Sequence, residues 1–587
     1  MNNPRLYLAV LAILLNNTTL AIQPPRLAVI LVVDQFSYNQ MRRLQPYFKY
    51  GFKTLLENGI CYTNAYFPHA NPGTAIGHTC LSTGVYARDH GIVCNHWYSP
   101  DGKREIKCDE APAENAAVFK KNGAAMHTYG KSAANICVDG LSDQFSIESS
   151  PLNPQHAVAI SYKSRAAIAT AGKLGKAIWY DDKHDEFTSS RAYFKQLPQW
   201  LTSFNTSGTI TQLKKNPWHT LYPIKSIAYA MHKPHTYTLI EPSCSPITER
   251  GVRRKPRTCP GTKQPFLITP AANQLLLDLA RVCINKHLAY QTNDRLLLWV
   301  CLSCLDKLGH EFGPDSIEVI DLLYHLDKQV GIFIKQVQER YGHDTLFVLT
   351  ADHGVTPVVE LLGNQGYDTA GRMDPRSLIT RMNEIIRQRY GIANIIANFS
   401  RPSLYLDMTK LGVLPIHKQD HILADLKEML VENPAIMRAW TYEELTSECP
   451  TNSDITNYFK QQFFPGRSGV IAVQPYPYSV LKRKPNRGTH NTPYYQDTHV
   501  PLVIYQPSRL KHQIFNEQIP MLQFAPTIAH LLHVQQPSAC TAKLLPGLEV
   551  EATPGPSTQR MPLGRHRGQE SRARTLLGHS TRRGQAK

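Results

Sequence analysis

The sequence predicts an α/β fold: a central, mostly parallel sheet with helices on both faces and inserted cap regions. Three observations support this prediction. Short apolar segments recur along the chain, they are rich in β-branched residues, and amphipathic helical patterns separate them. The chain has 587 residues, of which 42% are hydrophobic, so it can bury a large core. Its length fits one large domain with insertions, or about two to four smaller domains.

Six apolar segments are expected to form parallel strands, because they are short and bounded by polar turns. The clearest helical pattern runs from Ile317 to Tyr341, where apolar residues recur at spacings typical of one helix face. Residues 168–290 and 360–460 interrupt the alternation, and we interpret them as insertions that form cap regions over the active edge of the sheet. The six expected strands are 27–33, 157–160, 296–302, 345–349, 469–473 and 500–505.

Residues 1–21 have the pattern of a signal peptide. Arg5 supplies a positive start, residues 6–15 form an apolar run, and residues 19–21 (Thr-Leu-Ala) end in a small residue suited to cleavage. The run is short for a membrane span, and no other stretch approaches about 18 apolar residues. We therefore expect a periplasmic or secreted protein with no stable membrane partner.

The formal net charge of +18 is concentrated partly at the C-terminus. Residues 551–587 hold eight basic residues against two acidic ones and little apolar content. This composition is typical of a disordered, solvated tail, which we assign to residues 547–587. A nucleic-acid-binding arm is the alternative interpretation, and no nucleic-acid partner is expected.

Twelve cysteines fit an oxidising compartment. Cys94 and Cys108 are candidates for one disulfide and Cys244 and Cys259 for another, although connectivity does not follow from sequence. Residues 301–304 form a C-x-x-C with no second pair at zinc-ribbon spacing, so core packing is the favoured role over metal binding or redox chemistry.

Carboxylates follow three of the expected strands. Asp34, Asp306 and Asp352 each come at or just after the end of an apolar segment. In an open α/β sheet, ligands bind at the carboxyl ends of the strands, so these side chains are expected to lie together. Three clustered carboxylates repel each other unless a cation neutralises them.

Histidines accompany these carboxylates. His310 lies four residues after Asp306, on the same side of a helical turn, and His353 follows Asp352 directly. His490 precedes the segment 500–505. Mixed aspartate and histidine ligands suit Zn²⁺, with Mn²⁺ or Fe as alternatives.

A candidate nucleophile follows the first carboxylate. Thr74 comes after Pro72 and Gly73, near the start of a helical stretch where free N–H groups attract anions. A threonine hydroxyl is a weak nucleophile at neutral pH, and a metal ion can activate it. The alternative is that Thr74 only caps the helix.

The candidate ligands and the nucleophile, taken in chain order, resemble those of the alkaline phosphatase superfamily. The resemblance is strongest to the PafA-like alkaline phosphatases, which are phosphomonoesterases with a threonine nucleophile. The residues that carry it are Asp34, Thr74, Asp306, His310, Asp352, His353 and His490. The resemblance covers roughly residues 25–546, the expected catalytic domain. Two departures are Ala75-Ile76, where the family has Gly-Pro, and Asn491, where it has glycine. Further matching segments are residues 95–98, 157–165, 177–182, 309–314 and 497–502.

The resemblance implies two zinc ions per chain. Thr74 is expected to ligate the second zinc and to attack phosphorus, giving a phosphothreonine that water then hydrolyses. His499 is the rival of His490 as the last ligand, and we expect His78 and His499 to pack behind the site. The resemblance implies one zinc held by Asp306, His310 and His490 and another held by Asp34, Asp352 and His353.

The same resemblance makes Asn95, Lys163 and Arg165 phosphate ligands. Cations beside the non-bridging oxygens favour the dianion of a monoester, so small-molecule phosphate monoesters are the expected substrates of a monomeric enzyme. The alternative is a phosphodiesterase or nucleotide pyrophosphatase of the same fold. A non-catalytic binding protein is a third hypothesis, which would require lost ligands.

Overall fold

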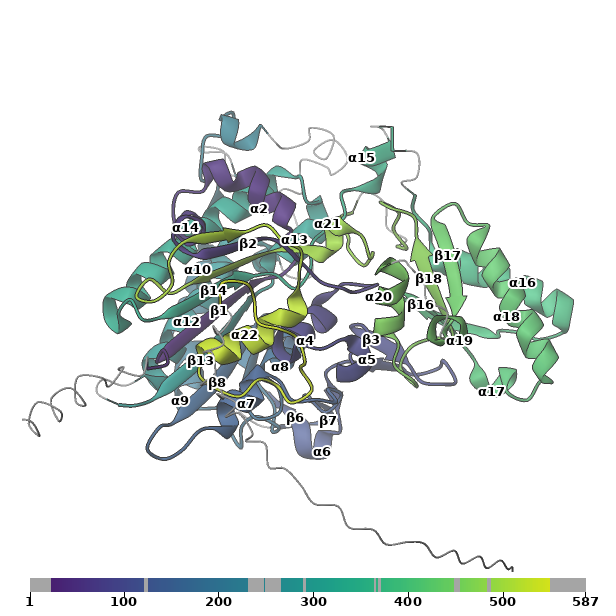
Figure 1. Ribbon diagram of the computed structural model, residues 1–587, viewed down its shortest axis with the longest axis horizontal. Coiled ribbons are helices and arrows are strands. Elements are labelled where there is room, and N and C mark those ends of the chain that lie inside the picture. The colour runs from purple at the N-terminus through teal and green to yellow at the C-terminus, as the bar shows by residue number, and fades with distance from the viewer. Residues whose placement is uncertain are drawn as a thin grey trace, which may run out of the picture. The chain divides into compact units, whose positions relative to one another are not determined.

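A ten-stranded sheet forms the centre of the protein (Figure 1). The computed structural model describes residues 23–120, 125–230, 247–248, 265–288, 292–363, 366–367, 371–447, 454–482 and 487–548. The strand order is β10-β9-β8-β13-β1-β14-β19-β2-β20, with β21 paired to β2. These strands are β1 (Leu27–Val33), β2 (Ile60–Tyr66), β8 (Gln155–Ser161), β9 (Lys176–Asp181), β10 (Glu186–Thr188), β13 (Arg295–Leu302), β14 (Leu346–Thr350), β19 (His499–Tyr505), β20 (Gln513–Phe515) and β21 (Ile519–Pro520).

The middle of this sheet is parallel. Strands β9, β8, β13, β1 and β14 pair in parallel, with Val33 opposite Leu302 and Val32 opposite Thr350. Every residue of β1 is buried, which is why its sequence is apolar throughout rather than alternating. The register brings the carboxyl ends of β1, β13 and β14 to one edge of the sheet. The predicted α/β fold with a mostly parallel central sheet is therefore confirmed.

Two of the six expected strands are not parallel. The segment 500–505 forms most of β19, which is antiparallel to both β14 and β2. The segment 469–473 contributes to β18 (Ile471–Pro475) in a separate antiparallel sheet. An apolar run indicates burial on both faces but not strand direction, which depends on how the chain returns to the sheet.

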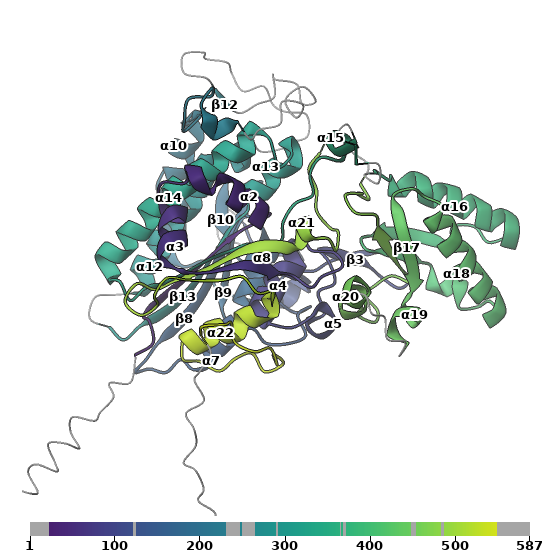
Figure 2. The same ribbon diagram turned by 45° about the horizontal axis from the view of Figure 1, so that its top comes forward.

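Helices cover both faces of the central sheet (Figures 1 and 2). One layer contains α2 (Tyr38–Leu44), α3 (Gly51–Asn58), α12 (Pro270–His287), α13 (Cys304–Phe312) and α14 (Ile317–Tyr341). The other contains α4 (Thr74–Thr83), α7 (Leu141–Ile147), α8 (Ser164–Ala171) and α22 (Phe524–Leu531).

A smaller α/β layer lies beside the central sheet and has a hydrophobic core of its own. Its four antiparallel strands have the order β15-β16-β18-β17. It contacts the centre where Asn71 Nδ2 donates to the carbonyl of Arg401 at 2.7 Å and Gln462 Nε2 donates to that of Val93 at 2.8 Å. Its main elements are α16 (Pro375–Tyr390), β15 (Ile396–Ser400), β16 (Ser403–Leu406), α18 (Ile416–Val431), β17 (Ile436–Thr441), α20 (Asp454–Gln462) and β18.

The smaller layer contains most of the expected 360–460 insertion and continues to residue 475. The 168–290 region behaves differently, because β9 and β10 extend the central sheet and α12 packs on β13 and β8. The expected signal peptide, most of the basic tail, Cys244 and Cys259 lie outside the described residues. Within the described part of the chain, Cys94 and Cys108 are both free and buried. No helix in that part is long and apolar enough to cross a membrane.

Candidate active site

Six side chains form two groups of aspartate and histidine at the carboxyl edge of the central sheet. Within each group, one ligand atom per residue lies within 4.8 Å of the others. These groups have the same composition as the two ligand sets that the resemblance implied. The first group contains Asp306, His310 and His490, and the second contains Asp34, Asp352 and His353.

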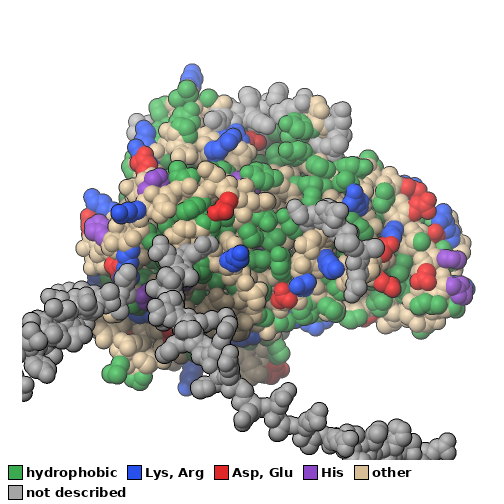
Figure 3. Space-filling view, in the orientation of Figure 1, with side chains coloured by type: hydrophobic (Ala, Val, Ile, Leu, Met, Phe, Trp, Pro, Cys, Tyr) green, Lys and Arg blue, Asp and Glu red, His purple; other side chains and the backbone are tan. Residues whose placement is uncertain are grey.

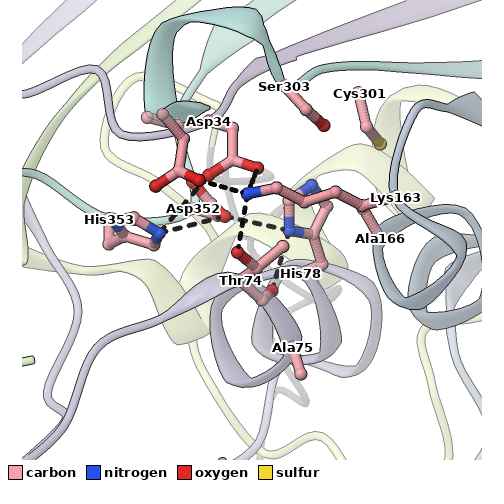
Figure 4. Close-up of polar contacts among 12 residues, drawn as sticks. Asp34, Thr74, Ala75, His78, Lys163, Ala166, Cys301, Ser303, Asp352 and His353 are labelled. Carbon is pink, nitrogen blue, oxygen red and sulfur yellow. Dashed lines mark hydrogen bonds and ion pairs between the residues drawn. The ribbon is translucent and has the colours of Figure 1, made fainter. Parts of the chain in front are cut away.

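The second group comes from two adjacent parallel strands. Asp34 follows β1 directly, and Asp352 and His353 lie two and three residues after the end of β14. His353 Nε2 lies 3.4 Å from Asp34 Oδ1 and 3.5 Å from Asp352 Oδ2 (Figure 4). All three atoms are buried without a hydrogen-bond partner. Buried polar atoms that converge in this way are typical of a cation site.

The charge state of the second group follows from its burial. Burial lowers the pKa of His353, but Asp352 and Asp34 outweigh this effect and raise it to about 9. Burial raises the pKa of Asp352, and the nearby His353 and His78 more than offset this, so its pKa lies well below the ordinary value. A metal ion would therefore displace the proton of His353 on binding.

The first group is built on α13, which begins just after β13. His310 Nε2 lies 3.2 Å from Asp306 Oδ1, one helical turn away, and His490 Nε2 lies 3.6 Å from the same oxygen. The Nδ1 atoms of His310 and His490 lie 2.9 Å from the carbonyls of Gly488 and Pro72. These contacts orient both rings so that Nε2 faces Asp306.

Thr74 is the first residue of α4, a helix that packs closely against Asp352 of the second group. Gly77 allows this approach, because a Cβ at that position would overlap the backbone carbonyl of Asp352. His78 Nδ1 lies 2.8 Å from the Thr74 carbonyl and 3.2 Å from Asp352 Oδ2. His78 therefore connects the start of α4 to the second group, which agrees with its expected place behind the site.

Lys163 joins the two groups to Thr74. Its Nζ lies 2.5 Å from Asp34 Oδ2 and 3.2 Å from Thr74 Oγ1 (Figure 4). The same nitrogen lies 2.6 Å from Asp306 Oδ2. Burial lowers the pKa of Lys163, but the carboxylates of Asp306 and Asp34 outweigh it, so the pKa is raised and the side chain is an ammonium. One cation thus contacts a carboxylate of each group and the candidate nucleophile.

The other expected phosphate ligands lie at the starts of α4 and α8. Asn95 Oδ1 accepts a hydrogen bond of 2.9 Å from the N–H of Ala75. Arg165, two residues after Lys163, has a buried Nε without a hydrogen-bond partner.

Two residues that no sequence pattern singled out are Gln35, which contacts both groups, and Arg401, whose carbonyl lies beside Asn71, three residues before Thr74. Gln35 donates hydrogen bonds to Asp306 and to Asp352, and its only sequence signal is that it follows Asp34. Arg401 comes from the smaller layer and has a buried Nη1 without a partner. No local pattern predicts it, because its neighbour Asn71 is 330 residues away in the sequence.

His499 does not join either group. Its Nε2 lies 2.9 Å from the carbonyl of Thr63, and its ring stacks on Tyr38 with centroids 4.4 Å apart. His490 is therefore the histidine beside Asp306 and His310, as the resemblance implied. Each group offers three nitrogen and oxygen ligand atoms, from side chains that are all buried except for the half-buried His310, and this set fits a divalent cation such as Zn²⁺.

Residues 28–496 match the family model described as type I phosphodiesterase / nucleotide pyrophosphatase. The chain is 28% identical to the alkaline phosphatase PafA of Elizabethkingia meningoseptica over 547 residues, which covers 89% of this chain and 94% of PafA. It is 29% identical to the alkaline phosphatase PhoV of Synechococcus elongatus, covering 89% of this chain and 93% of PhoV. The crystal structure of wild-type PafA matches with a TM-score of 0.76 and 25% identity, covering 89% of this chain and 99% of that one.

Proposed function

Because this chain belongs to the type I phosphodiesterase / nucleotide pyrophosphatase family, within the alkaline phosphatase superfamily, we propose that it hydrolyses phosphate monoesters at a two-metal site with Thr74 as nucleophile. PafA and PhoV, which match almost the whole chain, are alkaline phosphatases, so this chain is a phosphoric ester hydrolase. The monoester preference, the threonine nucleophile and zinc as the metal are the parts of this proposal that need testing.

One observation carries the proposal. The ammonium of Lys163 contacts Asp34 of one ligand group, Asp306 of the other, and the hydroxyl of Thr74. A nucleophile between two cation sites and beside a fixed positive charge is the arrangement that phosphoryl transfer requires, since its transition state spreads negative charge over several oxygens.

The reaction we propose has two displacements. Thr74 Oγ attacks phosphorus as its hydroxyl proton passes to solvent, the bond from phosphorus to the ester oxygen breaks, and the leaving oxygen takes a proton from solvent and departs as the alcohol. Water then attacks the phosphothreonine, releases phosphate and restores the hydroxyl. Two bound zinc ions would lower the pKa of the Thr74 hydroxyl and neutralise the negative charge on the leaving oxygen.

The residues of the chain divide the remaining tasks. Asn95 holds the N–H of Ala75 at the start of α4, which keeps Thr74 at the helix N-terminus. A carboxylate oxygen that binds a metal no longer needs the ammonium, so Lys163 becomes available to a phosphoryl oxygen. Arg165 has an unpaired donor for a second such oxygen.

A second candidate is phosphodiester or pyrophosphate hydrolysis, which the family description names. It needs the same metals and the same threonine. Lys163 and Arg165 favour the monoester, because the monoester dianion has one more charged oxygen for a cation to bind. On the face in Figure 3, basic and acidic side chains are interspersed rather than gathered in one basic patch.

We also propose that the protein acts outside the cytoplasm, in the periplasm or secreted. The support is the pattern of residues 1–21, where a positive residue, an apolar run and a small-residue site follow one another.

The test combines metal analysis with two assays on the purified protein. We expect about two zinc ions per chain, loss of activity on chelation and recovery with zinc. An aryl phosphate monoester should be hydrolysed faster than the matching diester. Full activity without transition metal would contradict the two-metal proposal, and a preference for the diester would favour the second candidate.

A further inference from the structure

Gln35 lies between the two ligand groups and contacts both. Its side-chain Nε2 donates a hydrogen bond of 2.8 Å to Asp306 Oδ1. Its backbone N–H donates one of 3.1 Å to Asp352 Oδ1. The residue is buried, with 1% of its surface exposed. A single residue therefore has a hydrogen bond to one carboxylate of each group, directly after the third carboxylate, Asp34.

The backbone of Gln35 adopts a conformation that glutamine disfavours. Its φ is 73°, in the left-handed region where a Cβ crowds the following carbonyl. Glycine adopts this region without strain. The turn after β1 therefore does not itself require glutamine, and the side chain must contribute something else.

The side chain of Gln35 also fits against α13. The Cβ that an alanine at position 309 would add meets the Gln35 amide oxygen first, and the next two nearest atoms also belong to Gln35. Gly309 lies between Asp306 and His310, so Gln35 packs against the turn that carries two of the three residues of the first group. The amide is thus fixed in position on its oxygen side while its nitrogen donates to Asp306.

We propose that Gln35 is a positioning residue that orients the carboxylates of Asp306 and Asp352 for two divalent cations. This inference rests on the proposed two-metal function. A carboxylate rotates about its side-chain bonds, and a hydrogen bond to one oxygen fixes the direction of the other lone pairs. The amide of Gln35 fixes the orientation of the Asp306 carboxylate in this way. Because the amide is neutral, it does not compete with a metal ion for the carboxylate, whereas the ammonium of Lys163 does.

Two substitutions separate this role from a structural one. Gln35→Gly removes the amide and relieves the backbone strain, whereas Gln35→Met keeps the side-chain volume and the strain but removes the donor. Asn394→Gly is the matched control, because Asn394 also has a positive φ, of 53°, and lies in the smaller layer. The backbone hydrogen bond to Asp352 remains in both Gln35 variants.

The experiment starts from zinc-loaded protein and measures zinc retained after timed exposure to a chelator, by mass spectrometry, together with the thermal midpoint in excess zinc. We expect both Gln35 variants to lose zinc about 10- to 100-fold faster than wild type, the usual cost of removing such a hydrogen bond. Gln35→Gly should have a thermal midpoint at least equal to that of wild type, and Asn394→Gly should release zinc at the wild-type rate.

Zinc release from both Gln35 variants within about twofold of wild type would overturn this inference, since a tenfold change is the smallest expected. Faster release from Asn394→Gly as well would also overturn it, because a substitution remote from the site would then have the same effect as loss of the Gln35 amide. A wild-type protein that binds no divalent metal would overturn the proposed function too, and the untreated wild-type sample reveals that case separately.

Discussion

The ammonium of Lys163 lies 3.2 Å from the hydroxyl of Thr74. This distance is within hydrogen-bonding range, so Lys163 stabilises an oxygen that becomes negative as its proton leaves. Thr74 also heads α4, where the free N–H groups of the first turn favour an anion. Positive charge from a side chain and from the backbone therefore converges at the proposed nucleophile.

Replacing Thr74 with alanine should reduce turnover of an aryl phosphate monoester by about 10³-fold or more, because the covalent route is lost. Thr74→Ser should retain far more activity, since it keeps the hydroxyl. Acid quenching during turnover should trap phosphate on residue 74 of the wild type and not of Thr74→Ala. Thr83→Ala, at the other end of α4, is the control that should remain active. Wild-type turnover in Thr74→Ala would refute the assignment.

Lys163 and Arg165 should set the preference for monoesters. A charged hydrogen bond contributes about 1.5–3 kcal/mol, so each alanine variant should lose about 10- to 100-fold in monoester kcat/KM. Diester kcat/KM should fall much less, because the diester has one fewer charged oxygen. The measurement is kcat/KM for both substrates in the single and double variants, with Lys173→Ala beyond the end of α8 as control. An equal fall for both substrates would show that the pair has a structural role.

The sequence allowed prediction of the parts of the site that depend on residues close together in the chain or at the ends of neighbouring strands. Asp34 and Asp352 follow apolar segments, and the ends of adjacent parallel strands must meet, so their proximity could be inferred. The pair Asp306 and His310 depends only on helical spacing. The α/β fold followed from the same alternation of segments.

The remaining features depend on contacts between distant segments. His490 and His499 are nine residues apart and both precede or begin β19, and only the contacts with Pro72 and Thr63 distinguish them. The position of Arg401 depends on how the smaller layer packs. The direction of β19 was not predictable because its apolar run is compatible with either orientation.

The packing of Gly309 against Gln35 gives a prediction about stability. Gly309→Ala should lower the thermal midpoint, since its Cβ would overlap the amide oxygen of Gln35. In a Gln35→Gly background the three nearest atoms are gone, so the same substitution should cost much less. A double-mutant cycle of thermal unfolding in excess zinc should give a coupling energy of about 1–3 kcal/mol. Additive effects would show that Gln35 does not occupy this space.

Acid should destabilise the protein through His69, which lies outside both ligand groups. Both ring nitrogens of His69 are buried without a hydrogen-bond partner, and 1% of the residue is exposed. Burial lowers its pKa from 6.5 to about 3. The folded state therefore stays neutral at a pH where the unfolded chain already binds a proton.

The direction in which pH changes stability follows from the pKa of His69, which is 6.5 in the unfolded chain and about 3 in the folded protein. The stabilising contribution of neutral His69 is complete above about pH 6.5 and is lost as the pH falls towards about 3, because the unfolded chain gains the proton first. Between about pH 7 and pH 5, His69 alone should reduce the free energy of unfolding by about 2 kcal/mol.

His69→Phe removes the titrating group and keeps a planar ring beside Phe67, whose ring centroid lies 5.3 Å from that of His69. The thermal midpoint of this variant should fall less than that of wild type between the two pH values. Both proteins are compared at the same zinc concentration, so that metal loss affects them equally. His417→Gln, at an exposed position, should reproduce the wild-type pH dependence. If His69→Phe and wild type show the same pH dependence, His69 is protonated in the folded state or is reached by water, and its burial does not limit acid stability.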